Sequence, residues 1–219
     1  RWVPVAQDIV AHFGLKPGDR ILDVGCGVGF FLQTAQRKNW EVYGTEYTDA
    51  AVAQARDKGI AMFKGSILDS PFADDYFDVI TSFEVLEHLN TPIKEISKFK
   101  SLVRPGGVVY LTTPNFNSLN RYMFKEKYNV IEYPEHLSYY TPRSIHRLFS
   151  SNGFSKVSIR TTGFSITRLR YSMNLHEEGY VGPATTDEIV RTRLEKNSRM
   201  RFLKRAANFV LSVTGKGDA

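Results

Sequence analysis

Apolar residues recur at two different spacings along this chain, and the spacing changes from one segment to the next. Short runs rich in Val, Ile, Phe and Tyr are typical of buried strands, whereas apolar positions three and four residues apart are typical of helices. The two patterns alternate over the first 165 residues. They predict strands over 20–25, 41–47, 60–66, 77–83, 108–114 and 154–162, and helices over 4–13, 29–38, 49–58, 92–103 and 142–150.

Residues with strong capping and turn preferences bound these elements. Thr48, Thr91 and Thr141 each precede a helical pattern and are predicted N-caps, and a proline directly follows the last two. The sequence Arg-Pro-Gly-Gly at 104–107 predicts a turn before the fifth strand. Because alternating strands and helices build a mostly parallel sheet with helices on both faces, the expected fold class is α/β.

Length and composition narrow the class of protein. The chain has 219 residues, 42% of them hydrophobic and 24% charged, which is enough for one sizeable core and ordinary for a globular protein. We expect a main domain over 1–165 and an appendage over 166–219. The chain has one cysteine, Cys26, and no leader pattern at its start, so the expected compartment is the cytoplasm.

The stretch 21–32, ILDVGCGVGFFL, places three glycines between a predicted strand and a predicted helix. Bare backbone at that point lets N–H groups approach a polar ligand closely, although an ordinary tight turn is the alternative. The dinucleotide fingerprint G-x-G-x-x-G is not met, because Phe30 stands where it needs a small residue. No Gly-Lys-Ser/Thr follows, which excludes a phosphate-binding P-loop.

As a set, the motifs of this chain resemble the class I S-adenosylmethionine (SAM)-dependent methyltransferases. DVGCGVGFFL is similar to their first motif, and Glu46 in GTEY ends the second strand, where a carboxylate accepts hydrogen bonds from ribose hydroxyls. Segments 63–92 and 102–115 resemble their later motifs, and 134–154 resembles the branch that includes ubiquinone-biosynthesis-like enzymes. The resemblance covers roughly residues 1–165 and implies a Rossmann-like three-layer sandwich.

The resemblance implies that the glycine loop forms much of a SAM site. Asp23 would help to hold the amino group of the methionine part, and Glu46 would bind the ribose. Phe83 and Glu84, at the end of the fourth predicted strand, would border the methionine part. The loop residues expected to contact SAM are Gly25, Cys26, Gly27 and Gly29.

The adenine side of the site is implied by fewer residues. The ring of Tyr47 can lie against the adenine face, and the backbone N–H of Ile67 can serve a ring nitrogen. Ser66 stands where the family often has an acidic residue, and Asp69 can substitute for that residue from three positions on. Plain core packing is the alternative for Tyr47, as it is for Phe83.

Methyl transfer from a sulfonium is an in-line displacement, so alignment and exclusion of water can supply most of the catalysis. A general base is needed only for an acceptor that holds its proton, such as a hydroxyl. His136 follows the fifth predicted strand and is the candidate base or substrate ligand, with a loop-ordering role as the alternative. His88 follows Glu87 and is interpreted as structural. No metal site is expected.

The acceptor side has fewer sequence signals. One inter-element stretch carries several aromatic residues that indicate either a partly apolar pocket wall or a structural cluster. These residues are Tyr122, Phe124, Tyr128, Tyr133, Tyr139 and Tyr140. No Asn/Asp-Pro-Pro-Tyr sequence follows the fourth strand, which disfavours the methylation of nucleic-acid bases.

The tail differs in composition from the rest of the chain. Positions 191–205 contain seven Lys or Arg against one Glu, and the net charge of +6 permits acidic partners. A basic helix here could contact anionic lipid or phosphate, or it could pack on its own domain or on a second subunit. Sheets of the resembling family end with a seventh, antiparallel strand. We expect that strand to follow Ala219, and a short irregular substitute at 179–182, GYVG, is the alternative.

The expected function is therefore SAM-dependent methyl transfer to a small or lipid-linked metabolite, with an oxygen acceptor favoured and S-adenosylhomocysteine as the product. Methylation of RNA or protein is the alternative among enzymes. A SAM-binding module without turnover is the alternative from another class.

Overall fold

The computed structural model describes residues 9, 12–128, 130–161 and 208–218, and the chain divides into two compact units. The core unit comprises residues 1–113 and 148–156, and the second unit comprises 114–147 and 157–219. The domain boundary expected near residue 165 lies outside the described residues.

A five-stranded parallel sheet forms the centre of the core unit, in the order β3-β2-β1-β4-β5. The strands are β1 Arg20–Val24, β2 Glu41–Glu46, β3 Ala61–Lys64, β4 Phe77–Phe83 and β5 Val103–Thr112. Because every pairing is parallel, the carboxyl ends of all five strands meet at the same edge. The strand order reverses between β1 and β4, the kind of position at which open α/β sheets bind their ligands.

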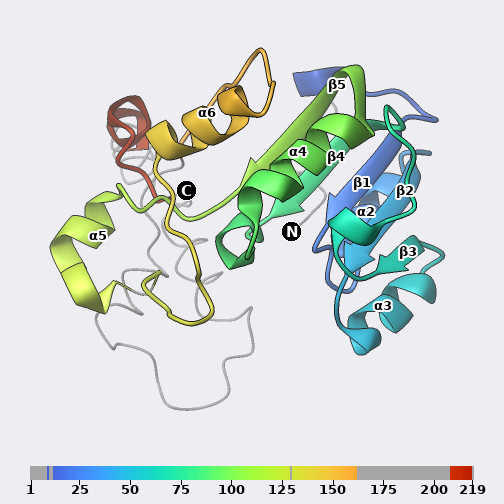
Figure 1. Ribbon diagram of the computed structural model, residues 1–219, viewed down its shortest axis with the longest axis horizontal. Helices are drawn as coiled ribbons and strands as arrows, with labels where there is room; N and C mark the ends of the chain where they lie inside the picture. Colours follow the sequence, from blue (N-terminus) through green and yellow to red (C-terminus); the bar gives the residue numbers. More distant parts are fainter. Residues whose placement is uncertain (1–8, 10–11, 129, 162–207, 219) are drawn as a thin grey trace, which may run out of the picture. The chain divides into compact units, whose positions relative to one another are not determined.

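Helices cover both faces of this sheet. The connecting helices are α2 Phe30–Gln36, α3 Asp49–Arg56 and α4 Pro92–Leu102. The chain crosses the sheet in one direction from β1 to β3 and in the other from β4 to β5, so right-handed connections put α2 and α3 on one face and α4 on the other. Figure 1 shows α4 in front of β4 and β5. This arrangement confirms the predicted α/β sandwich.

Burial of the central strands agrees with two covered faces. Neighbouring residues of a strand point to opposite faces, and both Ile21 and Leu22 of β1 are fully buried. On β4, Val79 and Ile80 repeat the pattern. The predicted helix over 4–13 is described only at residues 9, 12 and 13, which are helical.

The predicted sixth strand is wrong for the residues described. Val157 and Ile159 are half-buried between exposed neighbours, so the alternation that suggested a strand is present. However, residues 154–161 adopt no strand conformation. A strand also needs a partner for its backbone groups, and among the described residues β5 pairs only with β4. A seventh strand beyond Ala219 stays a prediction.

The Arg-Pro-Gly-Gly sequence predicted as a turn forms a bulge inside β5 instead. Phe77 pairs with Val103, and the next register pair joins Val79 to Val108, so residues 104–107 lie opposite Asp78 alone. A Cβ atom on Gly107 would lie 2.8 Å from the carbonyl oxygen of Asp78. The glycine therefore permits the close approach of the two strands at the bulge.

The three predicted N-cap threonines all precede helices, but they do different things. Thr141 precedes α6, Pro142–Ser151, where its Oγ1 accepts the Ser144 N–H at 3.2 Å and its own N–H donates to Ser144 Oγ at 2.8 Å. Thr48 and Thr91 make no side-chain cap bond. The hydroxyl of Thr48 donates to Glu46 instead.

The second unit contains α5 Leu119–Phe124, a 3-10 turn at Lys125–Lys127 and a described C-terminal segment that is helical over 208–214. The side-chain amide of Asn115 donates to the carbonyls of Gly215 at 3.0 Å and Gly217 at 2.7 Å. These bonds tie the C-terminal segment to the chain that follows β5. In the part of the chain that the structure describes, no helix combines the length and apolar character needed to cross a membrane.

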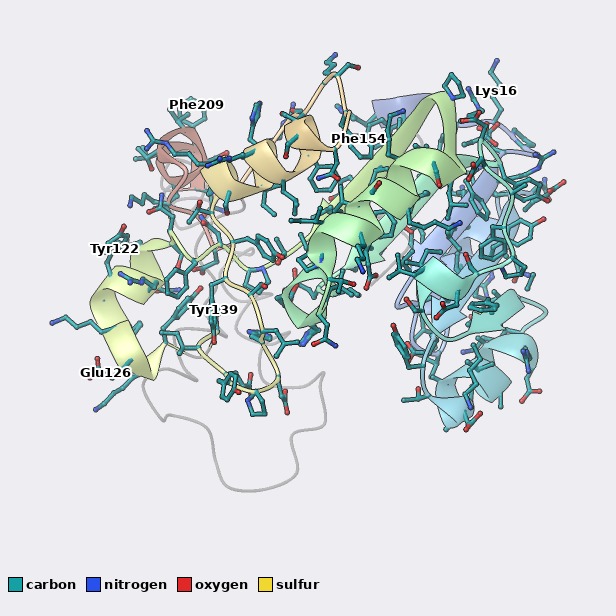
Figure 2. All side chains as sticks on the ribbon, in the orientation of Figure 1. Lys16, Tyr122, Glu126, Tyr139, Phe154 and Phe209 are labelled. Atoms are coloured by element: carbon teal, nitrogen blue, oxygen red, sulfur yellow. The ribbon has the colours of Figure 1, made fainter. Side chains whose placement is uncertain are left out.

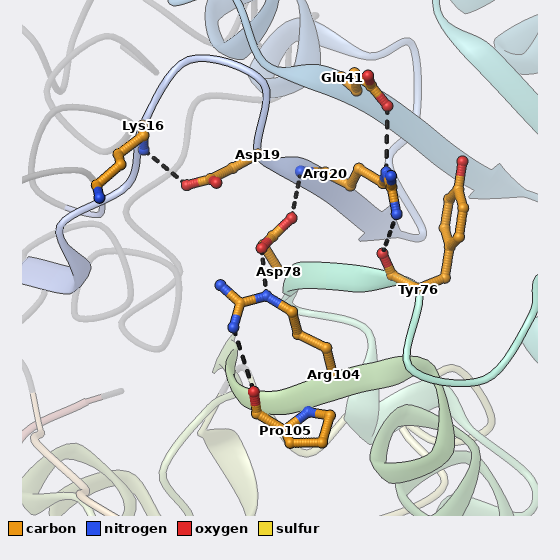
Figure 3. Close-up of polar contacts among 8 residues, drawn as sticks. All are labelled: Lys16, Asp19, Arg20, Glu41, Tyr76, Asp78, Arg104 and Pro105. Carbon is orange, nitrogen blue, oxygen red and sulfur yellow. Dashed lines mark hydrogen bonds and ion pairs between the residues drawn. The ribbon is translucent and has the colours of Figure 1, made fainter.

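A polar network joins the strands at their amino-terminal ends, opposite the edge where the glycine loop begins (Figure 3). The backbone N–H of Arg20 donates to Asp78 Oδ2 at 2.8 Å, and Arg104 Nε donates to Oδ1. Arg20 also lies over the ring of Tyr76 and 3.4 Å from Glu41. Desolvation acts to raise the pKa of Asp78, but the hydrogen bonds and charges of Arg20 and Arg104 hold it below the ordinary value.

We predict that Asp78→Asn lowers the free energy of unfolding by about 1 to 2 kcal/mol at pH 7, because it removes a charged acceptor shared by three strands. Since the folded pKa lies below the unfolded value, this contribution is present above pH 3.8 and is lost as the pH falls through the folded pKa. Urea unfolding between pH 7 and pH 3 measures it. The control Glu41→Gln, an exposed partner of Arg20, should change stability by less than about 0.5 kcal/mol. Equal losses in both variants would contradict the prediction.

Candidate cofactor site

The loop from residue 25 to 29 connects β1 to α2 at the carboxyl edge of the sheet. Its glycines have left-handed backbone, with φ of 70° at Gly25, 53° at Gly27 and 76° at Gly29. Residues with a Cβ atom rarely adopt this conformation, so the sharp turn requires glycine at these positions.

The three glycines nevertheless face different surroundings. A Cβ atom on Gly25 would lie 2.5 Å from Val85 Cγ2, and one on Gly29 would lie 2.4 Å from Ile60 Cδ1. A Cβ atom on Gly27 would meet nothing within 4 Å. Gly25 and Gly29 therefore permit close packing within the protein, whereas Gly27 presents bare backbone to open space that a ligand can occupy.

Backbone and side-chain oxygens at the end of β2 hold this loop. The Thr45 carbonyl accepts the N–H groups of Gly25 at 3.0 Å and Cys26 at 3.1 Å. The Gly27 N–H donates to Glu46 Oε2 at 3.0 Å. The glycine loop is thus in direct contact with Glu46, the residue predicted to bind the ribose. The parallel pairing of β1 with β2 brings the ends of the two strands together.

The carboxylate of Glu46 is extensively hydrogen-bonded. Besides Gly27, it accepts the N–H groups of Tyr47 at 2.8 Å and Thr48 at 3.1 Å, and the Thr48 hydroxyl at 3.2 Å, all three at Oε1. Oε1 thus accepts three donors, whereas Oε2 accepts, among the described residues, only the Gly27 N–H and keeps an acceptor site. A ribose hydroxyl can therefore donate to Oε2 without replacing any of these bonds.

Burial determines the protonation of two residues, Asp23 near the end of β1 and Cys26 in the glycine loop. Asp23 is 3% exposed and accepts the Thr81 hydroxyl at 2.8 Å. Burial raises the pKa of Asp23 to about 7, an effect that the Thr81 bond only partly offsets. Burial, followed by the negative charges of Asp23 and Glu46, raises the pKa of Cys26 to about 12. Cys26 therefore remains a thiol at neutral pH and is not a nucleophile.

The residues predicted to border the adenine have distinct settings. Tyr47 is 61% exposed, so its ring is not part of the core. Ser66 accepts the Leu68 N–H at 3.2 Å and caps the short 3-10 helix Ile67–Asp69. The side chain of Ile67 is buried, which leaves recognition at this position to its backbone.

At the end of β4, Phe83 packs within the protein, whereas Glu84 has an unusual backbone conformation. The ring of Phe83 lies 5.1 Å from that of Phe31 and 5.9 Å from that of Tyr110, which is the packing that the alternative interpretation described. Glu84 has a φ of 55°, and its N–H donates to the Thr112 carbonyl at 2.9 Å. Left-handed backbone at a residue other than glycine is costly and is enriched at functional sites.

Sequence reasoning missed two residues that shape this edge of the sheet. Glu87 is 2% exposed, and its Oε2 accepts the Thr113 hydroxyl at 2.9 Å. Burial, with the charge of Glu84 adding to it, raises the pKa of Glu87 above its ordinary value. Thr81, the partner of Asp23, is fully buried. Nothing in the sequence pattern reveals either contact, because the partners are separated by 26 and 58 residues.

His136, the predicted base, belongs to the second unit. Its Nδ1 lies 2.7 Å from the Val130 carbonyl oxygen, and its N–H donates to the Glu132 carbonyl at 2.8 Å. Because a carbonyl can only accept, the Val130 contact puts the proton on Nδ1. These bonds order the loop as the alternative interpretation described, and they also define a tautomer with its lone pair on Nε2.

The aromatic stretch of the second unit divides into buried and exposed residues. Tyr128 and Tyr140 are buried. Tyr122 and Tyr133 are 50% and 82% exposed, and Tyr122 projects from α5 in Figure 2. The structural-cluster interpretation therefore holds for Tyr128 and Tyr140, and the pocket wall stays a prediction.

Comparison with known proteins gives the family of the chain. The methyltransferase domain family matches residues 4–159. The chain belongs to this family. The match includes every predicted cofactor residue and confirms the resemblance to class I SAM-dependent methyltransferases.

Similar proteins carry related names. The ubiquinone biosynthesis O-methyltransferase of Pseudomonas aeruginosa is 35% identical over 107 residues, which are 46% of this chain and 46% of that protein. The protein of the same name from Alkalilimnicola ehrlichii is 35% identical over 122 residues, 52% of this chain and 49% of that one. The chain thus aligns with about half the length of these curated relatives.

Solved structures share the fold at low identity. A SAM-dependent methyltransferase from Archaeoglobus fulgidus aligns with a TM-score of 0.62 and 19% identity, covering 94% of this chain and 88% of that one. One from Aquifex aeolicus aligns with a TM-score of 0.56 and 20% identity, covering 72% and 82%.

We predict that Asp23 makes the stability of the folded protein depend on pH near neutrality. The folded state holds the proton up to about pH 7 and the unfolded chain releases it near pH 3.8, so stability from this residue is full at low pH and is lost as the pH rises through 7. Relative to wild type, Asp23→Asn should therefore gain about 2 to 4 kcal/mol between pH 5 and pH 8.5. Urea unfolding of both proteins across this range measures the gain. A constant difference would show that Asp23 ionises at its ordinary pKa.

Proposed function

We propose that this protein transfers a methyl group from SAM to an oxygen atom of a small or lipid-linked metabolite. The observation that carries the proposal is the bare backbone at Gly27, open to a ligand and bonded to the carboxylate of Glu46. Membership of the methyltransferase domain family supports SAM as the donor. The names of the O-methyltransferase relatives support an oxygen acceptor.

The residues of the core unit offer suitable groups for each part of SAM. The backbone at Gly27 is open to the methionine part, and the Asp23 carboxyl below the loop can face its ammonium group. Glu46 offers carboxylate oxygens for the ribose hydroxyls, and the exposed ring of Tyr47 offers a face for the adenine. When bound, SAM supplies an electrophilic methyl group on a sulfonium.

The chain's own groups then have three tasks: to bind, to exclude water and to accept a proton. A hydroxyl acceptor must lose its proton as the new bond to carbon forms. In the tautomer defined by the Val130 carbonyl, Nε2 of His136 is the atom that can take this proton. Cys26, which stays protonated, takes no part in bond formation.

We further propose that the partner of this protein is a small molecule rather than nucleic acid, and that the reaction takes place in the cytoplasm. A basic C-terminal helix could contact an acidic surface or a second subunit, although most of that helix lies outside the described residues.

We predict that Glu46→Gln weakens SAM binding about tenfold to a hundredfold, the range that corresponds to the loss of one charge-assisted hydrogen bond. Isothermal titration calorimetry with SAM and with S-adenosylhomocysteine measures the change, and thermal melting checks that the variant is folded. Glu41→Gln, at the exposed start of the same strand, is the matched control and should bind as wild type does. Unchanged affinity in folded Glu46→Gln would remove Glu46 from the cofactor site.

We predict that His136→Asn lowers kcat for phenolic acceptors about a hundredfold and leaves SAM affinity unchanged. An asparagine amide can still donate to the Val130 carbonyl, so the loop keeps its order. Methyl transfer from labelled SAM to a panel of catechols and phenols, followed from pH 6 to pH 10, measures the effect. Because ionised phenols need no base, the deficit should shrink at high pH.

His146→Asn, on the exposed side of α6, is the control for that experiment. A His136→Asn variant with wild-type kcat at neutral pH would end the proposed base role. No transfer by the wild-type protein to any catechol or phenol, nor to a second panel of amines and carbon acids, would support the module without turnover.

A further inference from the structure

The carbonyl of Val28 lies before α2 and takes no part in the hydrogen bonds of that helix. Val28 directly precedes Gly29, the N-cap of α2, and the first intrahelical bond runs from the Gln33 N–H to the Gly29 carbonyl at 2.9 Å. Gly29 has no side chain, and α2 has no side-chain cap bond. The end of the glycine loop is held by the Gly29 N–H, which donates to the Cys26 carbonyl at 3.0 Å, and by the partner of the Val28 carbonyl.

Lys58 supplies that partner. Its Nζ donates to the Val28 carbonyl oxygen and lies 4.5 Å from the centre of the Phe30 ring. One ammonium group thus contacts both residues that flank Gly29. A hydrogen bond from a charged donor is stronger than one between neutral groups, and a cation over an aromatic face adds to it.

The turn that carries Lys58 is a platform for this part of the loop. Lys58 follows α3, and the neighbouring Ala55 and Ile60 are the residues against which Gly29 packs. At the other end of α2, the Gln36 side chain donates to the Gly59 carbonyl at 3.0 Å. The same turn therefore fastens α2 at both ends.

The loop needs such fastening because it is rich in glycine. A glycine loses more conformational freedom on ordering than any other residue, so a loose loop would bind a ligand at a large entropic cost. Thr45 and Glu46 hold Gly25, Cys26 and Gly27 from the β2 side. Lys58 holds the loop where it enters α2, from the α3 side.

We propose that Lys58 is a positioning residue for SAM binding, which acts by holding the Val28–Gly29 peptide and so keeps the Gly27 backbone in its ligand-ready conformation. The choice of ligand rests on the proposed function, whereas the effect on the loop does not. Lys58 acts through the loop and carries no chemical step. Its loss should therefore change cofactor affinity and leave kcat at saturating SAM unaltered.

The test compares Lys58→Met, which keeps the aliphatic stem, with Lys58→Arg, which keeps the cation and its donors. The control is Lys38→Met. Lys38 is exposed in the turn after α2 and precedes Asn39, whose φ is 61°, much as Lys58 precedes Gly59 at 76°. Amide hydrogen exchange is measured in the ligand-free proteins, and SAM affinity is measured by calorimetry.

We predict that Lys58→Met raises the exchange rates of the Gly27 and Gly29 amides about tenfold to a hundredfold and weakens SAM binding about tenfold, in line with the loss of a hydrogen bond to a charged group. Lys58→Arg should restore most of both effects, and Lys38→Met should show neither. Phe30→Leu, which removes the ring but keeps the Val28 bond, should give a smaller change in the same direction.

Wild-type exchange at Gly27 and Gly29 in folded Lys58→Met, together with wild-type affinity, would overturn the proposal. Faster exchange with unchanged SAM affinity would overturn the role in binding. If the wild-type protein itself bound no SAM, the proposed function would fail, while the exchange rates would still decide whether Lys58 orders the loop. If Lys58→Met failed to fold, Phe30→Leu would decide the question, because wild-type exchange at Gly27 and Gly29 together with wild-type SAM affinity in that variant would contradict the proposal.

Discussion

The candidate site depends on the hydrogen bonds of one carboxylate, that of Glu46. It accepts N–H groups from the glycine loop and from the start of α3, and so joins three segments at the carboxyl edge of the sheet. Parallel pairing makes this possible, because Val24 is in register with Thr45 and the two strands end together. The Glu46 carboxylate, which the resemblance assigns to ribose binding, thus also holds the glycine loop in place.

The glycine loop must meet two conflicting requirements: its backbone must be accessible to a ligand, and it must be ordered. Access for a ligand requires the absence of side chains at Gly27, while precise binding requires that the loop be ordered. The protein resolves the conflict with contacts from both sides, through Thr45 and Glu46 on β2 and through Lys58 after α3. Close packing at Gly25 and Gly29 limits the loop further.

Burial of the carboxyl groups next to the glycine loop shifts their pKa values, so their ionisation can respond to a bound ligand. Burial keeps Asp23 partly protonated near neutral pH, and it also raises the pKa of Glu87. A cation bound beside such a group favours the ionised form, so binding of a cationic donor and release of a proton are coupled. The same burial keeps the Cys26 thiol protonated, so in the proposed methyl transfer this group takes no part in bond formation.

Much of the fold could be predicted from the sequence. The order of β1 to β5 and their helices follows from local periodicity, whereas Gly27 and Glu46 were assigned to the candidate site by the resemblance, and their contact with each other is what the structure adds. Only the tertiary structure decided which of the predicted segments and side chains formed the expected hydrogen bonds. Residues 154–161 alternate like a strand and form none, Arg-Pro-Gly-Gly became a bulge opposite Asp78, and the Thr48 hydroxyl turned to Glu46. The pairs Asp23 with Thr81 and Lys58 with Val28 were likewise invisible, because hydrogen bonds between distant segments depend on the assembled fold, whereas periodicity reports only which side of an element is buried.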